Sequence, residues 1–315
     1  MSQNILFIGG AGFIGSNLIK ELLRLDSDRW SVHIVEPPFA NISRLDGMNL
    51  HIYKGYLSDF DFIKNIIESK CITTIIHLVS TMVPGSSYED YKLEFESVIF
   101  PTVRLMQLCS QKNIKFIYFS SGGTVYGDRK TVVPFLESDA KKPISYYGLS
   151  KLTIEESVLF EHRTSGLQYL ILRPSNPYGH GQYLYGKQGL IAVSLGRILS
   201  NQSITVWGDG ASIRDYIYID DLTQIFRILL EKDIYNEIIN IGSGIGTTVN
   251  NIFDVLKEIV EEDVKVEYVE SRKSDVSNMI LDISKLKSII PDLRITEMHE
   301  GINRFYLSEK KKINR

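Results

Sequence analysis

The sequence predicts an α/β protein, with a doubly wound parallel sheet followed by a smaller, mixed α/β domain. Short apolar runs alternate with helical patterns in the first half of the chain, which is the arrangement of βαβ units. A glycine-rich turn, GGAGFIG at 9–15, separates the first apolar run from the first helical pattern. After about residue 173 the alternation loosens and Pro, Gly and Tyr gather in one segment, so we place a domain boundary there.

The elements of the first domain are predicted from the length and spacing of its apolar residues. Short, bounded apolar runs are typical of buried parallel strands, and they occur at 4–8, 31–36, 73–79, 114–121 and 167–173. Helical spacing of apolar residues predicts helices at about 13–23, 90–110 and 147–163. A further helix at about 220–232 is expected to return to this domain.

The second domain is predicted to hold shorter elements. The segment PSNPYGHGQYLYGKQG (174–189) is rich in Pro, Gly and Tyr and indicates an ordered loop. Short strands are expected within ITVWGDG, IRDYIYIDD and VKVEYVE. We therefore assign residues 1–173, joined by 220–240, to one domain, and residues 174–219 and 241–315 to the other.

Composition excludes several classes of protein. The 315 residues are 43% hydrophobic and 23% charged, with a formal net charge of −3, so a packed core is expected. No long basic tract is present, which argues against nucleic acid as a partner. No apolar run approaches the roughly 18 residues of a membrane helix, and no basic segment precedes the first apolar run, so we predict no membrane association and a cytoplasmic location. Cys71 and Cys109 have no metal or redox spacing and are predicted to be small core residues in a reducing compartment.

The glycine-rich turn predicts a dinucleotide site. Glycines between a strand and a helix allow close approach of the backbone to a pyrophosphate, and the helix start supplies amide donors. Glu36 ends the next predicted strand, where a carboxylate binds an adenosine ribose and repels a 2′-phosphate, so NAD is favoured over NADP in a Rossmann-type domain. The alternative is a packing turn with Glu36 as a surface acid. The turn residues predicted to bind are Gly9, Gly12, Phe13, Ile14 and Gly15.

Tyr147 and Lys151 form a candidate catalytic pair. They are four residues apart in SYYGLSK and share one face of the predicted helix. An ammonium there stabilises a phenolate, which otherwise forms near pH 10, and such a phenolate can remove the proton from a sugar hydroxyl. Tyr146 has no cation four residues after it. The alternative is an ordinary aromatic residue and lysine on a helix.

Five segments together resemble the extended short-chain dehydrogenases/reductases: GGAGFIG, SSGGTVYG, YYGLSK, LRPSNPYG and WGDGASIRDYIYIDDL. Within that group the chain is most similar to the nucleotide-sugar 4-epimerases of the UDP-galactose 4-epimerase type. The resemblance implies an NAD-binding domain at 1–173, a nucleotide-sugar-binding domain in the remainder, and a homodimer formed through the helices at 90–110 and 147–163. It also implies a UDP-linked sugar as the substrate.

The resemblance implies roles for individual residues. Tyr147 corresponds to the base and acid of the family, and Lys151 to the lysine that binds the nicotinamide ribose and lowers the phenol pKa. The residues that correspond to the family's substrate-binding positions are Asn176, Arg214, Arg272 and Asp275. Guanidinium groups suit the phosphates of such a substrate; the alternatives for these residues are a loop asparagine and surface ion pairs.

The chain departs from the family pattern at three positions. Gly122 stands where members carry Ser or Thr, so Ser121, Thr124 or a water is expected to replace the missing hydroxyl. Tyr56 stands where an aspartate follows the third strand, and stacking on adenine or simple packing are both open. Met279 corresponds to the residue that gates bulky sugar substituents.

Three functions follow from these residues. Gly123 and Thr124 occupy the positions of the acidic pair that 4,6-dehydratases carry, which argues against dehydration. Inversion at C4 of a UDP-hexose by a recycled NAD fits best. The alternatives are an NAD(P)H-dependent reductase of nucleotide-4-keto sugars and a catalytically inactive member that binds dinucleotide.

Overall fold

The predicted α/β class is confirmed in a computed structural model, which describes residues 3–25, 29–186, 188–260, 264–270 and 277–313. A parallel sheet of seven strands, ordered β10-β6-β5-β4-β1-β2-β3, lies at its centre. The strands are β1 Gln3–Ile8, β2 Trp30–Glu36, β3 His51–Lys54, β4 Thr74–His77, β5 Lys115–Phe119, β6 Tyr169–Pro174 and β10 Glu237–Ile241. The chain builds outward from β1 in both directions, which is the doubly wound arrangement.

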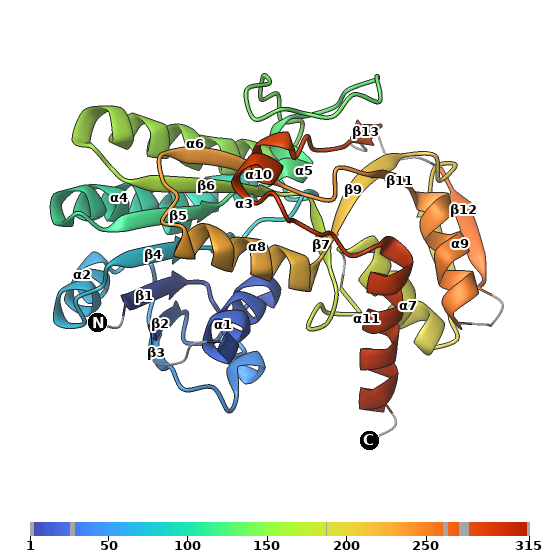
Figure 1. Ribbon diagram of the computed structural model, residues 1–315, viewed down its shortest axis with the longest axis horizontal. Helices are drawn as coiled ribbons and strands as arrows, with labels where there is room; N and C mark the ends of the chain where they lie inside the picture. Colours follow the sequence, from blue (N-terminus) through green and yellow to red (C-terminus); the bar gives the residue numbers. More distant parts are fainter. Residues whose placement is uncertain (1–2, 26–28, 187, 261–263, 271–276, 314–315) are drawn as a thin grey trace.

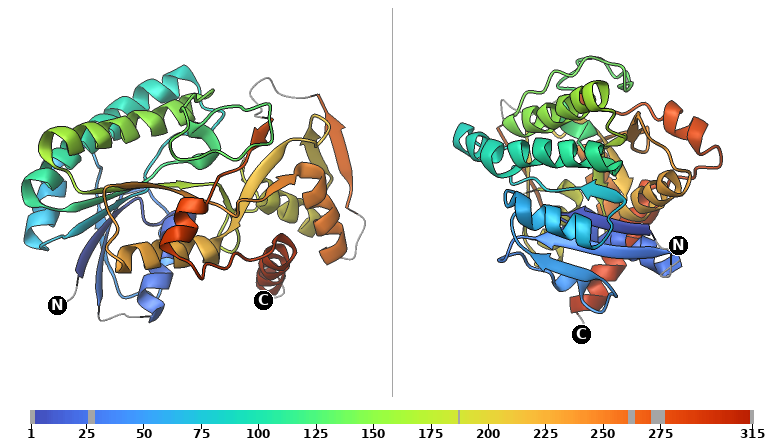
Figure 2. Two further views of the ribbon diagram at one scale, coloured as in Figure 1. Left: turned by 45° about the horizontal axis from the view of Figure 1, so that its top comes forward. Right: turned by 90° about the vertical axis from the view of Figure 1, so that its left-hand side faces the viewer.

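Helices cover both faces of this sheet (Figures 1 and 2). One layer contains α1 Phe13–Leu25 and α8 Ile219–Glu231, and the other contains α2 Phe60–Ser69, α4 Phe100–Lys112 and α6 Tyr146–Ser165. Alternate residues of a strand therefore enter different cores: Phe7 packs in the first cluster and Leu6 in the second. Burial on both faces explains the continuous apolar runs in the sequence. Residues 219–241 rejoin this sheet through α8 and β10.

The helix predicted at 90–110 is three connected pieces. These are α3 Tyr88–Glu94, the π-helical turn η2 Phe95–Ile99, and α4. The amide of Phe100 donates to the carbonyl of Phe95, five residues back. Pro101 follows directly, and proline has no N–H for a bond to the fourth residue before it and clashes with that carbonyl. The widened turn accommodates this proline without ending the helix.

The smaller domain contains a mixed sheet and a two-stranded sheet. Its strands and helices are β7 Asn176–Tyr178, β9 Ile213–Tyr218, β11 Gly246–Thr248, β13 Asn278–Met279, β8 Ile204–Trp207, β12 Val266–Val269, α7 Leu190–Leu199, α9 Val249–Val260 and α11 Met298–Ile313. Strand β9 pairs antiparallel with β11 and parallel with β7 and β13, and β8 pairs with β12. The three short strands predicted here are present. The loop predicted at 174–189 is wrong in part, because β7 begins two residues after β6.

The remaining short elements are α5 Gly122–Val125, α10 Ser284–Ile289 and a 3-10 turn, η1, at Ser43–Leu45. Cys109 is buried, as predicted, whereas Cys71 is exposed because it occupies the turn after α2, with a φ of 47°. Within the described ranges, no helix is both long and apolar enough to cross a membrane.

Candidate functional site

The predicted site residues lie mainly where the parallel strands end. In open parallel sheets, ligands bind beyond the carboxyl ends of the strands, near the point where the strand order reverses. The loops after β1 and β4 flank that point here, because β1 and β4 are neighbours. The turn after β5 carries Ser121 and Gly122, and α6 packs against this turn.

The glycine loop adopts the close-packed form that a dinucleotide site requires. Gly9 has a φ of 82°, and a Cβ on Gly15 would lie 2.6 Å from the carbonyl oxygen of Gly10, so α1 begins directly against the loop. Gly12 is exposed, and the nearest atom to a Cβ there would be 3.9 Å away. Phe13 and Ile14 form the first turn of α1. The exposed backbone at Gly12 fits the pyrophosphate of NAD.

Glu36 ends β2 beside this loop. Its Oε1 accepts a hydrogen bond of 2.5 Å from the amide of Ala11, and the side chain is buried. Burial raises the pKa of Glu36, while the Ala11 amide and Lys54 lower it. The carboxylate therefore ties the second strand to the glycine loop, a contact that was not predicted, and it lies where an adenosine ribose is expected.

Helix α6 places Tyr147 and Lys151 one turn apart. The Ser145 side chain caps the helix by accepting the Gly148 amide at 3.1 Å. Lys151 is buried, and its Nζ donates to the carbonyl of Phe119 at 3.0 Å. The ammonium lies 5.8 Å from the centre of the Tyr147 ring. Burial lowers the pKa of Lys151 to about 8, and nearby carboxylates oppose this shift.

The expected lowering of the phenol pKa is not what this structure shows. Burial raises the pKa of Tyr147 to about 12, and the charge of Glu94 adds to the rise. A hydrogen bond with Ser121 acts in the opposite direction. The Lys151 ammonium is bonded to the β5 backbone rather than to the phenol, so the lysine alone does not make Tyr147 a base at neutral pH.

The structure distinguishes the two hydroxyls expected to replace the one missing at Gly122. The Ser121 hydroxyl lies close enough to the Tyr147 phenol to lower its pKa. Thr124 Oγ1 is buried and has no hydrogen-bond partner among the described residues. A Cβ at Gly122 would lie 2.7 Å from Leu281 Cδ1 and 2.9 Å from the Arg173 carbonyl oxygen. The glycine is therefore required by packing, because no side chain fits there without a shift of the backbone.

Two of the four predicted substrate residues lie in the described part of the chain. Asn176 Nδ2 donates to the Asp215 carbonyl at 2.8 Å. Asn176 also lies beside Gly123, since a Cβ added to Gly123 would be 3.7 Å from Asn176 Oδ1. Arg214 lies on β9 and donates to the Ile213 carbonyl at 2.9 Å. Arg272 and Asp275 lie outside the described residues. Asn176 thus joins the Ser121 turn, and Arg214 belongs to the smaller sheet.

The two other unusual positions differ in exposure. Tyr56 is exposed, and its ring centre lies 6.5 Å from that of the exposed Phe39. Met279 is fully buried on β13, opposite Arg214 on β9. The interpretation of Met279 as a gate is therefore not supported, since its side chain belongs to the hydrophobic core.

Glu94 was not predicted from the sequence, and it lies near the Tyr147–Lys151 pair. It is fully buried at the end of α3, and it accepts hydrogen bonds from Ser80 and Thr81, which follow β4. The Ser150 hydroxyl, next to Lys151, donates to it at 3.5 Å. The sequence does contain an indication of this position. Tyr91, Phe95 and Val98 have the spacing of a buried helix face, and Glu94 is an acidic residue on that face.

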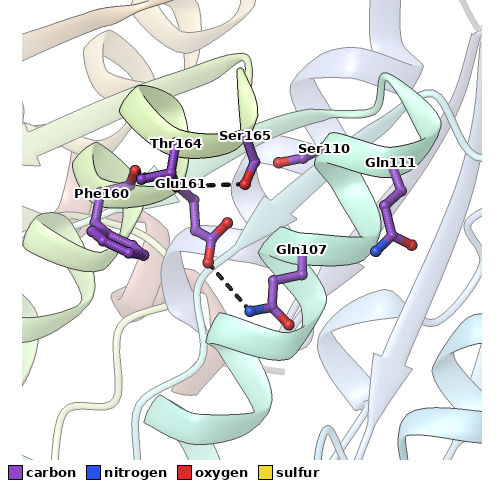
Figure 3. Close-up of a pocket in the computed structure, with 7 residues that line it drawn as sticks. All are labelled: Gln107, Ser110, Gln111, Phe160, Glu161, Thr164 and Ser165. Atoms are coloured by element: carbon purple, nitrogen blue, oxygen red, sulfur yellow. Dashed lines mark hydrogen bonds between the residues drawn. The ribbon is translucent and has the colours of Figure 1, made fainter.

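A surface groove between α4 and α6 is separate from this site (Figure 3). It is lined by Gln107, Ser110, Gln111, Phe160, Glu161, Thr164 and Ser165. None of these is a predicted site residue, and all lie on the two helices rather than at the strand ends.

Comparisons with known proteins place the chain in a family. Residues 5–242 match the model of the NAD dependent epimerase/dehydratase family. A dTDP-4-dehydro-6-deoxyglucose reductase of Escherichia coli is 32% identical, over 97% of this chain and 97% of its own. A putative UDP-glucose 4-epimerase of Methanocaldococcus jannaschii is 31% identical, over 95% and 96%.

A solved structure agrees over the whole fold. The UDP-glucose 4-epimerase of Thermotoga maritima with UDP-glucose is 32% identical, has a TM-score of 0.91 and covers 99% of this chain and 100% of its own. The chain therefore belongs to the NAD dependent epimerase/dehydratase family, and its cofactor is NAD.

Proposed function

We propose that this enzyme inverts C4 of a UDP-linked hexose, using a tightly bound NAD that is regenerated in each turnover. The observation that carries the proposal is the Tyr147 phenol, which lies beside Ser121 and one helical turn before the buried Lys151, whose Nζ is 5.8 Å from the centre of the ring. A phenol placed in this way can exchange a proton with a sugar hydroxyl. The 4-epimerases among the similar proteins, with UDP-glucose bound in one of them, support the choice of substrate.

In this proposal the reaction has two half-reactions, an oxidation at C4 and the reverse reduction. The glycine loop and Glu36 would hold oxidised NAD, which would accept the hydride from C4 and return it, and whose positive charge would favour the Tyr147 phenolate. Tyr147 takes the proton of the C4 hydroxyl as hydride leaves C4, which yields a 4-keto sugar. Ser121 holds the reacting oxygen against the phenol, and Lys151 adds positive charge. In the second half-reaction, after the keto sugar has presented its other face, Tyr147 returns the proton to the C4 oxygen.

Substrate anchoring is assigned to the smaller domain. Asn176 and Arg214, together with Arg272 and Asp275, bind the nucleotide diphosphate in this proposal. Binding energy located on the nucleotide leaves the sugar free to turn between the two half-reactions. Inversion requires a sugar that can turn while its nucleotide stays bound, whereas a one-way reduction does not.

A second candidate is a reductase of nucleotide-4-keto sugars. The E. coli reductase that is 32% identical over nearly the full chain favours it. The same Tyr147 would then donate a proton as hydride arrives from a reduced cofactor. Glu36 favours NADH over NADPH for such a reaction.

The test is a panel of UDP-hexoses incubated with the purified enzyme and no added cofactor, followed by proton NMR of the anomeric region. Epimerisation predicts conversion of one C4 epimer into the other, and Tyr147→Phe is expected to lower turnover by roughly 100-fold or more. Turnover only with added NADH and a 4-keto sugar, with stoichiometric NAD formed, would instead establish the reductase. No turnover in either assay by an enzyme that still binds NAD would establish the inactive, binding form.

A further inference from the structure

Glu94 is a buried carboxylate to which no role in the proposed reaction has yet been assigned. Its side chain has no solvent exposure, and burial of a carboxylate is costly unless hydrogen bonds compensate it. Oε1 accepts from Ser80 Oγ at 3.0 Å, and Oε2 accepts from the Thr81 amide at 3.0 Å and from the Thr81 hydroxyl. The loop after β4 therefore closes on this one carboxylate.

The same carboxylate reaches the catalytic helix. Ser150 Oγ donates to Oε1 at 3.5 Å, and Ser150 lies between Tyr147 and Lys151 on α6. The charge of Glu94 raises the pKa of Lys151 and also that of Tyr147. One side chain is thus linked by hydrogen bonds to the loop after β4 and by charge to both members of the pair.

The π-helical turn explains how Glu94 comes to this place. Glu94 is the last residue of α3, directly before η2. The π-helical turn η2 lies just before Pro101 and contains one residue more than a turn of α-helix. Side chains before this turn therefore point in a different direction, relative to those after it, than they would in a regular helix. Segments α3 and η2 both pack against α6. Inserted π-helical turns recur at functional sites, which agrees with the position of Glu94.

We propose that Glu94 is a positioning residue for the Tyr147–Lys151 pair: it holds the loop after β4 against α6 and supplies the counter-charge for the buried Lys151 ammonium. The proposal rests on the proposed function only in that this pair carries the proton transfer. Without a counter-charge, a buried lysine loses its proton more readily. A neutral Lys151 would neither favour the phenolate nor keep its present bond to Phe119 as strongly.

The charges around Lys151 come from several elements. Glu94 on α3 and Glu155 on α6 favour the ammonium, although Glu155 is already paired with Arg173 at 2.7 Å. The rings of Tyr118 on β5 and Tyr147 lie within 6 Å of it. His77 on β4 is neutral at pH 7, because burial and Lys151 lower its pKa to about 3. Of these two carboxylates, Glu155 is paired with the Arg173 guanidinium, so Glu94 is the one that serves as the counter-charge of Lys151.

The decisive variant is Glu94→Gln. Its amide can keep the hydrogen bonds, because serine hydroxyls accept as well as donate, while the charge is lost. Glu161→Gln is the matched control: Glu161 is also buried, on α6, but bonds Gln107 at 3.4 Å on the side of the groove in Figure 3. Glu94→Asp keeps the charge on a shorter side chain.

The measurement is the titration of Lys151 by NMR of protein labelled with ¹³C at lysine Cε. The Lys151 signal is identified by its loss in Lys151→Arg. We expect Glu94→Gln to lower the Lys151 midpoint by roughly one pH unit or more, with the midpoint unchanged in Glu161→Gln and near wild type in Glu94→Asp. At pH 7.5, kcat of Glu94→Gln is expected to fall about tenfold or more, with partial rescue in Glu94→Asp.

A Lys151 midpoint in Glu94→Gln equal to that of wild type would overturn the proposal. So would a midpoint shifted equally by Glu161→Gln. Should Glu94→Gln not fold, Thr81→Val removes one donor to the carboxylate, and an unaltered kcat in that variant would contradict the positioning role. Because the titration needs no substrate, a shifted midpoint in an enzyme that turns over none of the tested sugars would leave this inference standing and reject the proposed function alone.

Discussion

We propose that Ser121 supplies the hydroxyl that the chain lacks at Gly122. The Gly122 backbone packs against Leu281 and the Arg173 carbonyl, both far away in the sequence, so no local pattern could show why glycine is required. The Tyr147–Lys151 spacing and the glycine loop were predicted, because each is fixed within one helix or one turn. The choice between Ser121 and Thr124, and the role of Glu94, depended on how separate segments meet.

Removing the Ser121 hydroxyl is expected to impair catalysis, while removing that of Thr124 is not. Ser121→Ala deletes the hydroxyl that lowers the pKa of the Tyr147 phenol, and loss of one positioned hydrogen bond in a transition state lowers kcat by roughly 10²-fold. Thr124→Val deletes a hydroxyl without a hydrogen-bond partner in the described structure, at nearly equal volume. Steady-state kinetics of both variants check this. A larger loss in Thr124→Val than in Ser121→Ala would assign the role to Thr124.

The pH dependence of kcat/KM is expected to report Lys151. Its pKa is lowered by burial to about 8, so the ammonium is present below pH 8 and is lost as the pH rises through that value. Activity should therefore fall on the alkaline side with a midpoint near pH 8, well below the ordinary lysine range. Profiles from pH 6 to 10 measure this, and Lys151→Arg should lack the limb, since arginine stays charged. An identical alkaline limb in that variant would assign it to another group.

Five strands of the large sheet and the helices α1, α4, α6 and α8 were predicted, whereas β3, β10 and α2 in the same domain were not. Strands β1, β2, β4, β5 and β6 were visible because burial on both faces makes them largely apolar. β3 is short and lies at the edge, with His51 and Lys54 exposed, so its sequence has no such run. The π-helical turn was not predicted, although Pro101 marks its position.

The pairing of β6 with α6 is expected to depend on one buried ion pair. Arg173 and Glu155 have no solvent exposure and form hydrogen bonds of 2.7 and 3.0 Å. Glu155→Gln leaves the guanidinium charge buried without its partner, which costs about 3–5 kcal/mol of unfolding free energy. Glu156→Gln is the control, because the adjacent Glu156 forms only an exposed contact of 3.7 Å with Lys141, worth about 0–1 kcal/mol.

Denaturant unfolding of the two variants measures the difference. Unfolding free energies that fall equally for Glu155→Gln and Glu156→Gln would show that the buried pair does not hold α6 on the sheet. The control matters because both changes remove one negative charge from the same helix, so effects of net charge cancel.

At the scale of the whole molecule, the outer face of the α4–α6 layer suggests a partner. Phe160, which lines the groove of Figure 3, is 54% exposed, and Phe100, at the start of α4, is 62% exposed. Large exposed apolar side chains that share a face indicate an interaction surface. We propose that a second copy of the chain covers this face, in a two-fold dimer.

The dimer is tested by Phe160→Glu and by Val132→Glu as the control, since Val132 is similarly exposed at 58% but lies in the loop after α5. Light scattering with size-exclusion chromatography is expected to give a dimer for wild type and Val132→Glu, and a monomer for Phe160→Glu. A monomeric wild-type protein, or an intact dimer in Phe160→Glu, would contradict the proposed surface.

We propose that the whole molecule serves one reaction, in which hydride leaves C4 of a nucleotide sugar and returns to C4 of the same molecule through a bound NAD. The most direct measurement uses the UDP-hexose that turns over, carrying deuterium at C4, with no cofactor added. Retention of deuterium at C4 of the inverted product, by NMR and mass spectrometry, is the predicted result. Loss of the label from the product would contradict the account.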